Sequence, residues 1–264
     1  MIDFHNHVLP DVDDGPKSIE ESIEMLKFAS GQGIKKIVNT VHFQHPKMND
    51  RNVEYDYLKQ KINDLEKIIA NESLDLEILL SAEVFYLPNL VDISDNPITT
   101  IGNKNYMLIE FLANIFPTGY EQEFFKLQQN EITPIVAHPE RYKFVQNDIS
   151  ILNDWKNRGY VIQIDAGSIL GFFGKNVKNF SLEMIENGYI HIIGSDAHNN
   201  KKRNFCLFDA YESLGEIFSF DLVDILKQNS EKILEGEKVY NINKFTQKSR
   251  FSYLKEKIFK ICKF

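Results

Sequence analysis

Short apolar runs alternate with longer segments of helical periodicity along most of the chain, and this alternation limits the fold more than any other feature. Such a pattern is typical of repeated βα units, in which helices cover a sheet of parallel strands. The runs with the length and composition of strands are 2–5, 36–40, 76–82, 106–111, 133–137, 161–164 and 189–194. The sequence therefore predicts an α/β protein with a parallel sheet.

Helices are predicted between these strands. Ser18, with Glu21 three residues later, forms a capping-box signature ahead of an apolar helical pattern over 18–32. The other predicted helices are 52–70, 119–130, 149–157, 177–187, 206–214 and 221–227, and residues 84–105 are predicted to form a long loop. Barrels of βα units commonly use about 250 residues as one domain, so 264 residues predict a barrel over 1–242 followed by a tail, 243–264.

The charge distribution limits the partners of the chain. The formal net charge of −8 disfavours nucleic acid, whose phosphates attract basic surfaces. The tail has seven basic residues and one acidic residue (+6), so residues 1–242 carry −14. We predict a cytoplasmic protein, because no signal-peptide pattern, no membrane-spanning apolar run and no disulfide pattern of Cys206 and Cys262 is present in this sequence.

The tail has the pattern of a basic amphipathic helix. Phe251, Leu254, Ile258 and Ile261 recur at near-helical spacing among lysines. One interpretation is a helix packed on the barrel or a frayed terminus. The other is peripheral contact with a membrane that contains anionic lipids.

Histidines and carboxylates are placed where the predicted strands end. The active site of a parallel barrel lies at the carboxyl ends of its strands, because the βα loops meet there. Side chains at positions i and i+2 share one face of a strand, so His191 has the wrong parity and is predicted to face the helices. A lone histidine at a strand end is more often structural, but the joint pattern predicts one pocket. Its members are His5, His7, Asp14, His42, Glu83, Glu110, His138, Asp196 and His198.

This set of side chains favours a site with several metal ions. Four carboxylates in one pocket would repel each other unless cations were present. Mixed nitrogen and oxygen donors suit zinc, manganese or iron(II), and roughly three divalent ions would offset the carboxylates and leave positive charge for a phosphate group. Arg141 and Arg203, close after His138 and His198, are predicted to bind phosphate oxygens. The sequence therefore predicts a phosphoesterase.

Several segments together carry a family resemblance. They are Met-Ile-Asp-Phe-His-Asn-His at 1–7, Asp-Val-Asp-Asp-Gly-Pro at 11–16, His-Pro-Glu-Arg-Tyr at 138–142 and Gly-Ser-Asp-Ala-His at 194–198. From residue 1 to about 236 the sequence resembles the polymerase and histidinol phosphatase (PHP) superfamily. Within it, the sequence is most similar to manganese-dependent protein-tyrosine phosphatases of capsule and exopolysaccharide gene clusters. The resemblance implies a distorted TIM-like (β/α)7 barrel and hydrolysis of phosphotyrosine, with a polysaccharide-synthesis tyrosine kinase as the expected partner.

The resemblance also implies which residues hold which metal. Three sets are implied: His5, His7, Glu83 and Asp196; Glu83, Glu110 and His138; and Asp14, His42 and His198. The implied metal is Mn2+, with iron or zinc as alternatives. Asp11 and Asp13 remain alternatives to Asp14, and His45 is predicted to lie at the rim of the site.

Two other functions remain open at this stage. One is a small-molecule phosphatase that acts on a substrate such as histidinol phosphate, and the other is a catalytically silent barrel that serves as a scaffold for a kinase. A phosphatase with a cysteine nucleophile is disfavoured, because neither cysteine lies in a phosphate-cradling loop. The sequence is compatible with a monomer or an oligomer.

Overall fold

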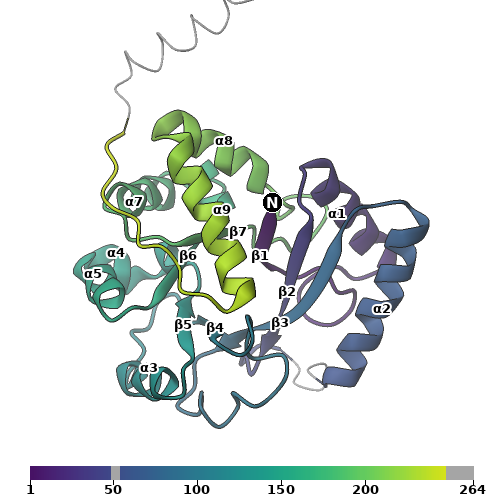
Figure 1. The fold of residues 1–264 in the computed structure, drawn as a ribbon, viewed down its shortest axis with the longest axis horizontal. Coiled ribbons are helices and arrows are strands. Elements are labelled where there is room, and N and C mark those ends of the chain that lie inside the picture. Colours follow the sequence, from purple (N-terminus) through teal and green to yellow (C-terminus); the bar gives the residue numbers. More distant parts are fainter. Residues whose placement is uncertain (49–53, 248–264) are drawn as a thin grey trace, which may run out of the picture.

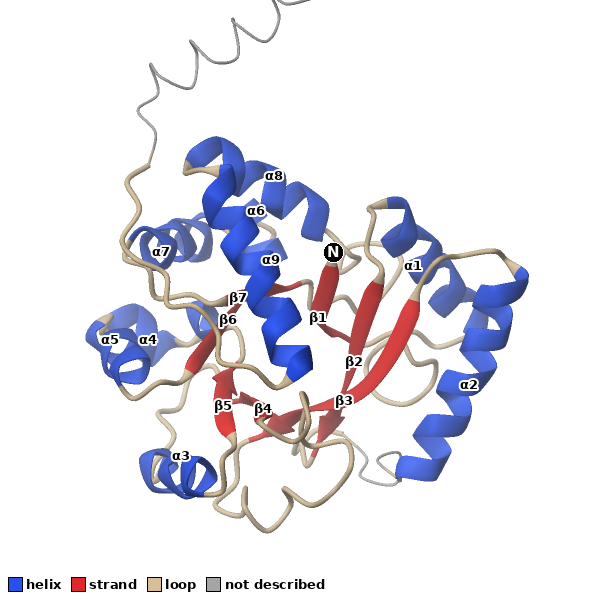
Figure 2. Ribbon diagram, in the orientation of Figure 1, coloured by secondary structure: helices blue, strands red, loops and turns tan. Residues whose placement is uncertain are grey.

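The computed structural model describes residues 1–48 and 54–247, and in them seven parallel strands form one sheet in the order β1 to β7. Figures 1 and 2 show the strands arranged in a ring, with most helices around the outside and α9 crossing one end of the ring. The strands are β1 (Ile2–Asn6), β2 (Lys36–Phe43), β3 (Glu77–Phe85), β4 (Tyr106–Glu110), β5 (Thr133–Val136), β6 (Val161–Asp165) and β7 (Ile192–Gly194). The predicted (β/α)7 barrel is confirmed, with strand ends shifted by a few residues.

Contacts between the first and the last strand segments close the barrel. Asn6 and Ala197 form a parallel bridge. The backbone N–H of His7 donates to the carbonyl of Ala197 at 2.8 Å, and that of Asp196 donates to the carbonyl of His5 at 2.7 Å. Closure therefore places the His5–His7 segment beside the Asp196–His198 segment.

The helices follow the strands in the predicted order, and the last two come after β7. They are α1 (Ile19–Gly31), α2 (Tyr55–Asn71), α3 (Tyr120–Gln129), α4 (Lys143–Asn147), α5 (Ser150–Asn157), α6 (Ala166–Leu170), α7 (Lys175–Glu186), α8 (Leu207–Ile217) and α9 (Phe220–Glu235), with the 3-10 helix η2 (Pro139–Arg141) after β5. The short elements η2, α4 and α6 were not predicted. The predicted helix 52–70 begins outside the described residues, and the predicted loop begins at residue 86 because β3 continues to Phe85.

Helix α9 is eight residues longer than its predicted end at 227, because it reaches Glu235. Ser219 caps it by accepting a hydrogen bond from the N–H of Leu222, and Gly236 ends it in the left-handed conformation (φ 73°). The added turns are retained by tertiary contacts, since Asn229 donates to the carbonyls of His191 and Tyr240. The prediction relied on the spacing of apolar residues, which gives no indication of these hydrogen bonds of Asn229.

Along one face of a strand, the side chains change from apolar at its start to polar at its carboxyl end. In β4, Tyr106 and Leu108 belong to a buried apolar cluster, and Glu110 follows at the same parity. In β6, Val161 belongs to the same cluster and precedes Gln163 and Asp165. Because residues two apart share a face, an apolar interior gives way to polar groups at the carboxyl ends of the strands.

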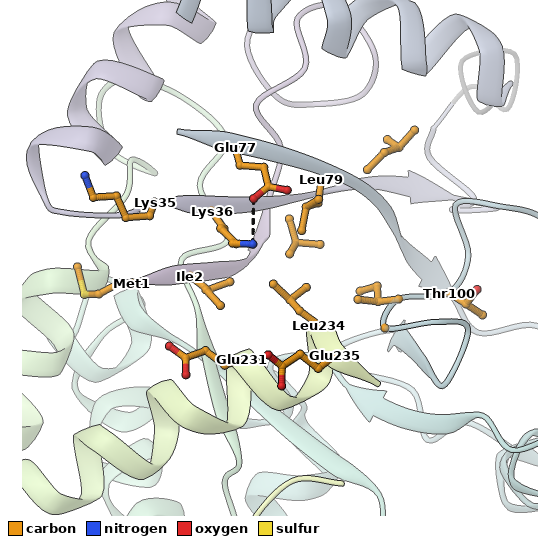
Figure 3. A pocket seen from close by; sticks show the side chains of 14 residues that line it. Met1, Ile2, Lys35, Lys36, Glu77, Leu79, Thr100, Glu231, Leu234 and Glu235 are labelled. Atoms are coloured by element: carbon orange, nitrogen blue, oxygen red, sulfur yellow. Dashed lines mark ion pairs between the residues drawn. The ribbon is translucent and has the colours of Figure 1, made fainter. Parts of the chain in front are cut away.

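The opposite end of the barrel contains a separate cavity of about 740 Å³ (Figure 3). The first residues of three neighbouring strands, Ile2, Lys36 and Glu77, line it, and Lys36 forms a 2.9 Å ion pair with Glu77. Leu234 of α9 covers another side. None of the residues predicted as metal ligands lines this cavity.

Most of the predicted tail, 248–264, lies outside the described residues. Its first part continues along α7, where the N–H of Phe245 donates to the carbonyl of Glu186 at 2.9 Å. The boundary at 242 and the amphipathic helix therefore stay predictions. Within the described part of the chain, no helix combines the length and apolar character needed to cross a bilayer.

Candidate metal centre

The nine side chains predicted as ligands converge at the carboxyl end of the barrel. A cavity of about 230 Å³ opens there, and seven of the nine line it together with Arg141 and Arg203. The other two, His5 and His7, are 0% and 1% exposed. Both belong to groups in which potential ligand atoms lie within 4.8 Å of one another.

The ligand atoms fall into four overlapping groups. They are His7, Asp14, His42 and His198; His5, His7 and Asp196; His5, Glu83 and His138; and His42, Glu83 and Glu110. Glu83 is shared by the last two groups. Its carboxylate oxygens lie 3.2 Å from His5 Nε2, 3.2 Å from His42 Nδ1 and 2.8 Å from His138 Nε2.

The groups overlap with the three implied ligand sets but do not coincide with them. Asp14, His42 and His198 fall together and are joined by His7. Of the first implied set, His5, His7 and Asp196 form one group. Glu83 belongs to other groups, although it lies 3.2 Å from His5 and 3.5 Å from His7. The implied set of Glu83, Glu110 and His138 is divided between two groups that share Glu83.

Several histidines are oriented by a hydrogen bond at the ring nitrogen that faces away from the cluster. His5 Nδ1 donates to Gln163 Oε1 at 3.1 Å, and His7 Nδ1 donates to Asp13 Oδ2 at 2.8 Å. The Nε2 atoms of both rings point toward Glu83 and Asp196. Fixing one ring nitrogen so that the other can bind is characteristic of histidines that ligate metals.

Unsatisfied polar atoms in the cluster fit divalent cations. Buried side-chain atoms without a hydrogen-bond partner among the described residues include His5 Nε2, His7 Nε2, His42 Nδ1, Glu110 Oε1 and His138 Nδ1. Such atoms cost free energy unless something binds them. Imidazole nitrogens and carboxylate oxygens together suit manganese, iron or zinc. The residues present therefore fit a metal centre.

The three neighbouring aspartates at 11, 13 and 14 take different positions. Asp14 Oδ1 lies 3.2 Å from His42 Nε2 and 3.1 Å from His198 Nε2. Asp13 instead accepts hydrogen bonds from His7 Nδ1 and from the N–H groups of Gly15 and His42. Asp11 is exposed. Of the three, only Asp14 joins a ligand group among the described residues.

The electrostatics of the cluster reflect its dense negative charge. Burial opposes protonation of His5, but the carboxylates of Glu83 and Asp196 outweigh this effect and raise its pKa to about 10. For Asp196, burial favours the neutral acid, yet His198 and Arg203 hold its pKa well below the usual value. The site is therefore organised to hold positive charge against carboxylates.

The two arginines are anchored by carboxylates beside the cavity. Arg141 Nη1 donates to Asp165 Oδ2 at 2.8 Å and to Asp196 Oδ2 at 2.7 Å. Arg203 Nη2 donates to the same Asp196 oxygen at 2.6 Å, and Arg203 Nε is buried without a hydrogen-bond partner within the described chain. Asp196 thus turns one oxygen to both arginines and the other toward the histidines.

Two ligand candidates have left-handed backbone conformations. His138 has φ 32° and Asp196 has φ 52°, and each lies two residues after the end of a strand, β5 and β7. Non-glycine residues with such angles are strained and cluster at functional sites. Next to Asp196, Gly194 leaves room for His5, since a Cβ there would lie 2.5 Å from the Cβ of His5.

Comparison with known proteins shows the family to which the chain belongs. The family described as "Capsular polysaccharide synthesis, CpsB/CapC" matches residues 1–262. The chain belongs to this family. The resemblance predicted from the motifs is therefore confirmed.

Relatives of known name cover nearly the whole chain. CapC of Staphylococcus aureus is 35% identical over 90% of this chain and 93% of its own length. Tyrosine-protein phosphatase YwqE of Bacillus subtilis is 34% identical over 91% of this chain and 94% of its own length. A solved structure from work on YwqE and on CpsB of Streptococcus pneumoniae, described as unique metal-dependent tyrosine phosphatases, has a TM-score of 0.86 and 32% identity. It covers 94% of this chain and 100% of the solved chain.

In this CpsB/CapC family member, sequence reasoning missed the polar contribution of β6. Gln163 holds both His5 Nδ1 and the N–H of His138, while Asp165 anchors Arg141. Glu140 accepts from the N–H of Asp165 and from Ser168, and burial together with Asp165 raises its pKa to about 7. The available signal was parity, because Gln163 and Asp165 alternate with apolar residues at the end of a strand.

The remaining predicted positions lie at or beyond the edge of the cluster. His45 lines the cavity with its Nε2 3.7 Å from Glu110, outside the ligand groups found among described residues. His191 lies away from the cluster, where its Nδ1 accepts from the N–H of Ile162. Cys206 is buried at the start of α8, and burial raises the pKa of its thiol.

Proposed function

We propose that this chain is a metal-dependent tyrosine-protein phosphatase that hydrolyses phosphotyrosine on a protein. The observation that carries the proposal is the convergence of nine ligand-type side chains and two arginines on one cavity of a CpsB/CapC family barrel. The predicted class agrees with the names of YwqE and CpsB, which are tyrosine-protein phosphatases.

The proposed metal ligands are the nine predicted residues, with Glu83 shared between neighbouring groups. When bound, divalent ions would supply an activated water and offset the negative charge of the phosphate. Manganese is our proposal for the native metal, and iron and zinc are alternatives that the same donors accept. Whichever metal is bound, Gln163 would orient the His5 ring and Asp13 would orient the His7 ring.

The proposed role of Arg141 and Arg203 is to bind the phosphate oxygens. Each guanidinium is partly exposed at the cavity, by 28% and 34%, while its carboxylate partners are buried. Anchored donors need little rearrangement as charge develops on the oxygens. The oxygen of water forms a bond to phosphorus, the bond from phosphorus to the tyrosine oxygen breaks, and the phenoxide leaves. The proton that the water loses ends on the departing tyrosine oxygen or on the released phosphate. Since a phenol has a pKa near 10, a strong acid is not required to assist its departure.

The proposed physiological substrate is a tyrosine kinase that regulates capsule or exopolysaccharide synthesis. Support comes from the capsular polysaccharide description of the family and from the tyrosine-phosphatase names of the relatives. Action in the cytoplasm and membrane contact through 243–264 are parts of the same proposal.

A comparison of substrates tests the proposed function. We expect the full-length, metal-loaded chain to hydrolyse a phosphotyrosine peptide with a kcat/KM at least about tenfold above that for histidinol phosphate, because peptide contacts add binding energy in the transition state. The reverse order would favour the small-molecule phosphatase. Absence of turnover of both substrates, with metal bound, would favour the silent scaffold.

Cys206→Ser is expected to leave kcat/KM for the phosphotyrosine peptide within about twofold of the wild type, because a buried thiol with a raised pKa cannot act as the thiolate nucleophile. Steady-state assays, with circular dichroism as a control for folding, would measure this. Complete loss of activity in a folded variant would contradict a mechanism without a cysteine intermediate.

A further inference from the structure

A second, smaller cavity with an aromatic wall adjoins the metal cavity. Its volume is about 120 Å³, and it shares Asp196 and Arg203 with the metal cavity. Phe172 and Phe173 line it from the turn that joins α6 to α7. The two phenylalanine side chains therefore lie in a cavity that adjoins the one lined by Arg141 and Arg203.

Both phenylalanines are more exposed than large apolar side chains usually are. Phe172 is 59% exposed and Phe173 is 37% exposed. Single exposed apolar residues are common and need no explanation. Here, two consecutive rings stand beside a cavity lined by the arginines, so their position, and not their exposure alone, calls for a function.

The two rings are held in place before any ligand binds. The Arg141 guanidinium lies over the Phe173 ring, 4.8 Å from its centroid. A Cβ on Gly167 would lie 3.2 Å from Phe172 Cδ2 and 3.3 Å from Phe173 Cε2, so both rings pack against α6 at a residue without a side chain. The turn itself is bounded by Gly171 and Gly174, whose φ angles of 94° and 93° favour glycine.

We infer that Phe172 and Phe173 form the binding slot for the phenyl ring of phosphotyrosine. This inference rests on the proposed function, in which Arg141 and Arg203 bind the phosphate. Only the ester oxygen separates phosphorus from the ring, so a phosphate held by the arginines places the ring at the adjoining cavity. Offset or edge-on contacts between aromatic rings stabilise the complex beyond the burial of apolar area.

The slot also explains selection of tyrosine over serine and threonine. Phosphoserine and phosphothreonine have no ring, so they lose the aromatic contact while keeping the contacts of the phosphate. The loss of this contact lowers the affinity for phosphoserine and phosphothreonine, and no steric clash is needed. Phe172 and Phe173 are therefore specificity-determining residues, distinct from the groups that act on phosphorus.

Calorimetry with two non-hydrolysable ligands tests the slot. The metal-loaded, full-length wild type is expected to bind benzylphosphonate about tenfold more tightly than methylphosphonate. Phe172→Ala should lose most of this preference while the Kd for methylphosphonate changes by less than about twofold. The double variant Phe172→Ala with Phe173→Ala should lose the preference fully, and its methylphosphonate Kd serves only as the reference for that ratio, because Phe173 also contacts Arg141. Phe125→Ala is the matched control, because Phe125 is a 58% exposed phenylalanine on α3 and lines neither cavity.

The outcomes separate the slot from the proposed function. Equal affinities in the wild type, a benzyl preference that survives the double variant, or equal weakening of both ligands in Phe172→Ala would each overturn the inference. These binding measurements do not depend on turnover. Failure of the wild type to hydrolyse a phosphotyrosine peptide is a different result, and it would overturn the proposed function.

Discussion

Glu83→Gln is expected to lower kcat/KM for a phosphotyrosine peptide about a thousandfold, because loss of one bound ion removes several kcal/mol of charge stabilisation. The residue Glu83 is 1% exposed, and its carboxylate lies within 3.5 Å of four imidazoles, those of His5, His7, His42 and His138. Glutamine keeps the size of the side chain but removes the negative charge of the Glu83 carboxylate, which lies next to all four imidazoles. Steady-state kinetics should be combined with metal content measured by mass spectrometry, which we expect to fall by one or more ions for each chain.

Glu77→Gln is the matched control for this variant. It makes the same substitution on the same strand, but Glu77 begins β3 at the opposite end of the barrel and pairs there with the exposed Lys36. Surface ion pairs contribute little to stability, so activity and metal content should stay near the wild-type values. Retention of more than about a tenth of wild-type activity by Glu83→Gln would argue against a shared ligand at this position.

Removal of divalent ions with a chelator is expected to abolish phosphatase activity and also to destabilise the fold. Without cations, four carboxylates remain close together, and buried ring nitrogens such as His5 Nε2 and His138 Nδ1 stay unsatisfied. Ligand concentrations about 100 times above Kd stabilise a protein by about 2.7 kcal/mol. Chelation should therefore lower Tm by about 5–10 °C in a domain of this size.

Re-addition of single metals would complete this experiment. We expect Mn2+ to restore both activity and Tm, and iron or zinc to restore Tm if they occupy the same donors. Calorimetric Tm provides a readout that does not depend on catalysis. One result would refute the metal centre. It is full phosphatase activity in protein that contains less than about one tenth of a metal ion per chain, because catalysis would then not need a bound ion.

The fold was largely predictable because its signals are local. Each strand of a parallel barrel is a short apolar run, and all seven runs predicted from the sequence correspond to strands. The errors concern ends and short elements. Helix α9 is extended by contacts of Asn229 with His191 and Tyr240, and η2, α4 and α6 are too short to show a helical period.

The sequence predicted which ligand-type side chains gather at one end of the barrel, but it did not predict several of their contacts. The ends of the strands and the rule of alternating faces indicated where ligand-type side chains gather, and the motifs indicated the family. Sequence left Asp11, Asp13 and Asp14 as alternatives, because neighbouring residues in a loop have no fixed periodicity. The structure separates them, since Asp13 orients His7 and Asp14 faces His42 and His198.

The sequence by itself determined the alternation of strands and helices, the family, and the placement of histidines and carboxylates at strand ends. Tertiary structure decided which ring nitrogen faces the cluster, which oxygen of Asp196 holds the arginines, and that Gln163 supports His5 from 158 positions away. The physical reason is that backbone periodicity depends on neighbours along the chain. The direction of a side-chain hydrogen bond depends instead on partners that meet only when the barrel closes.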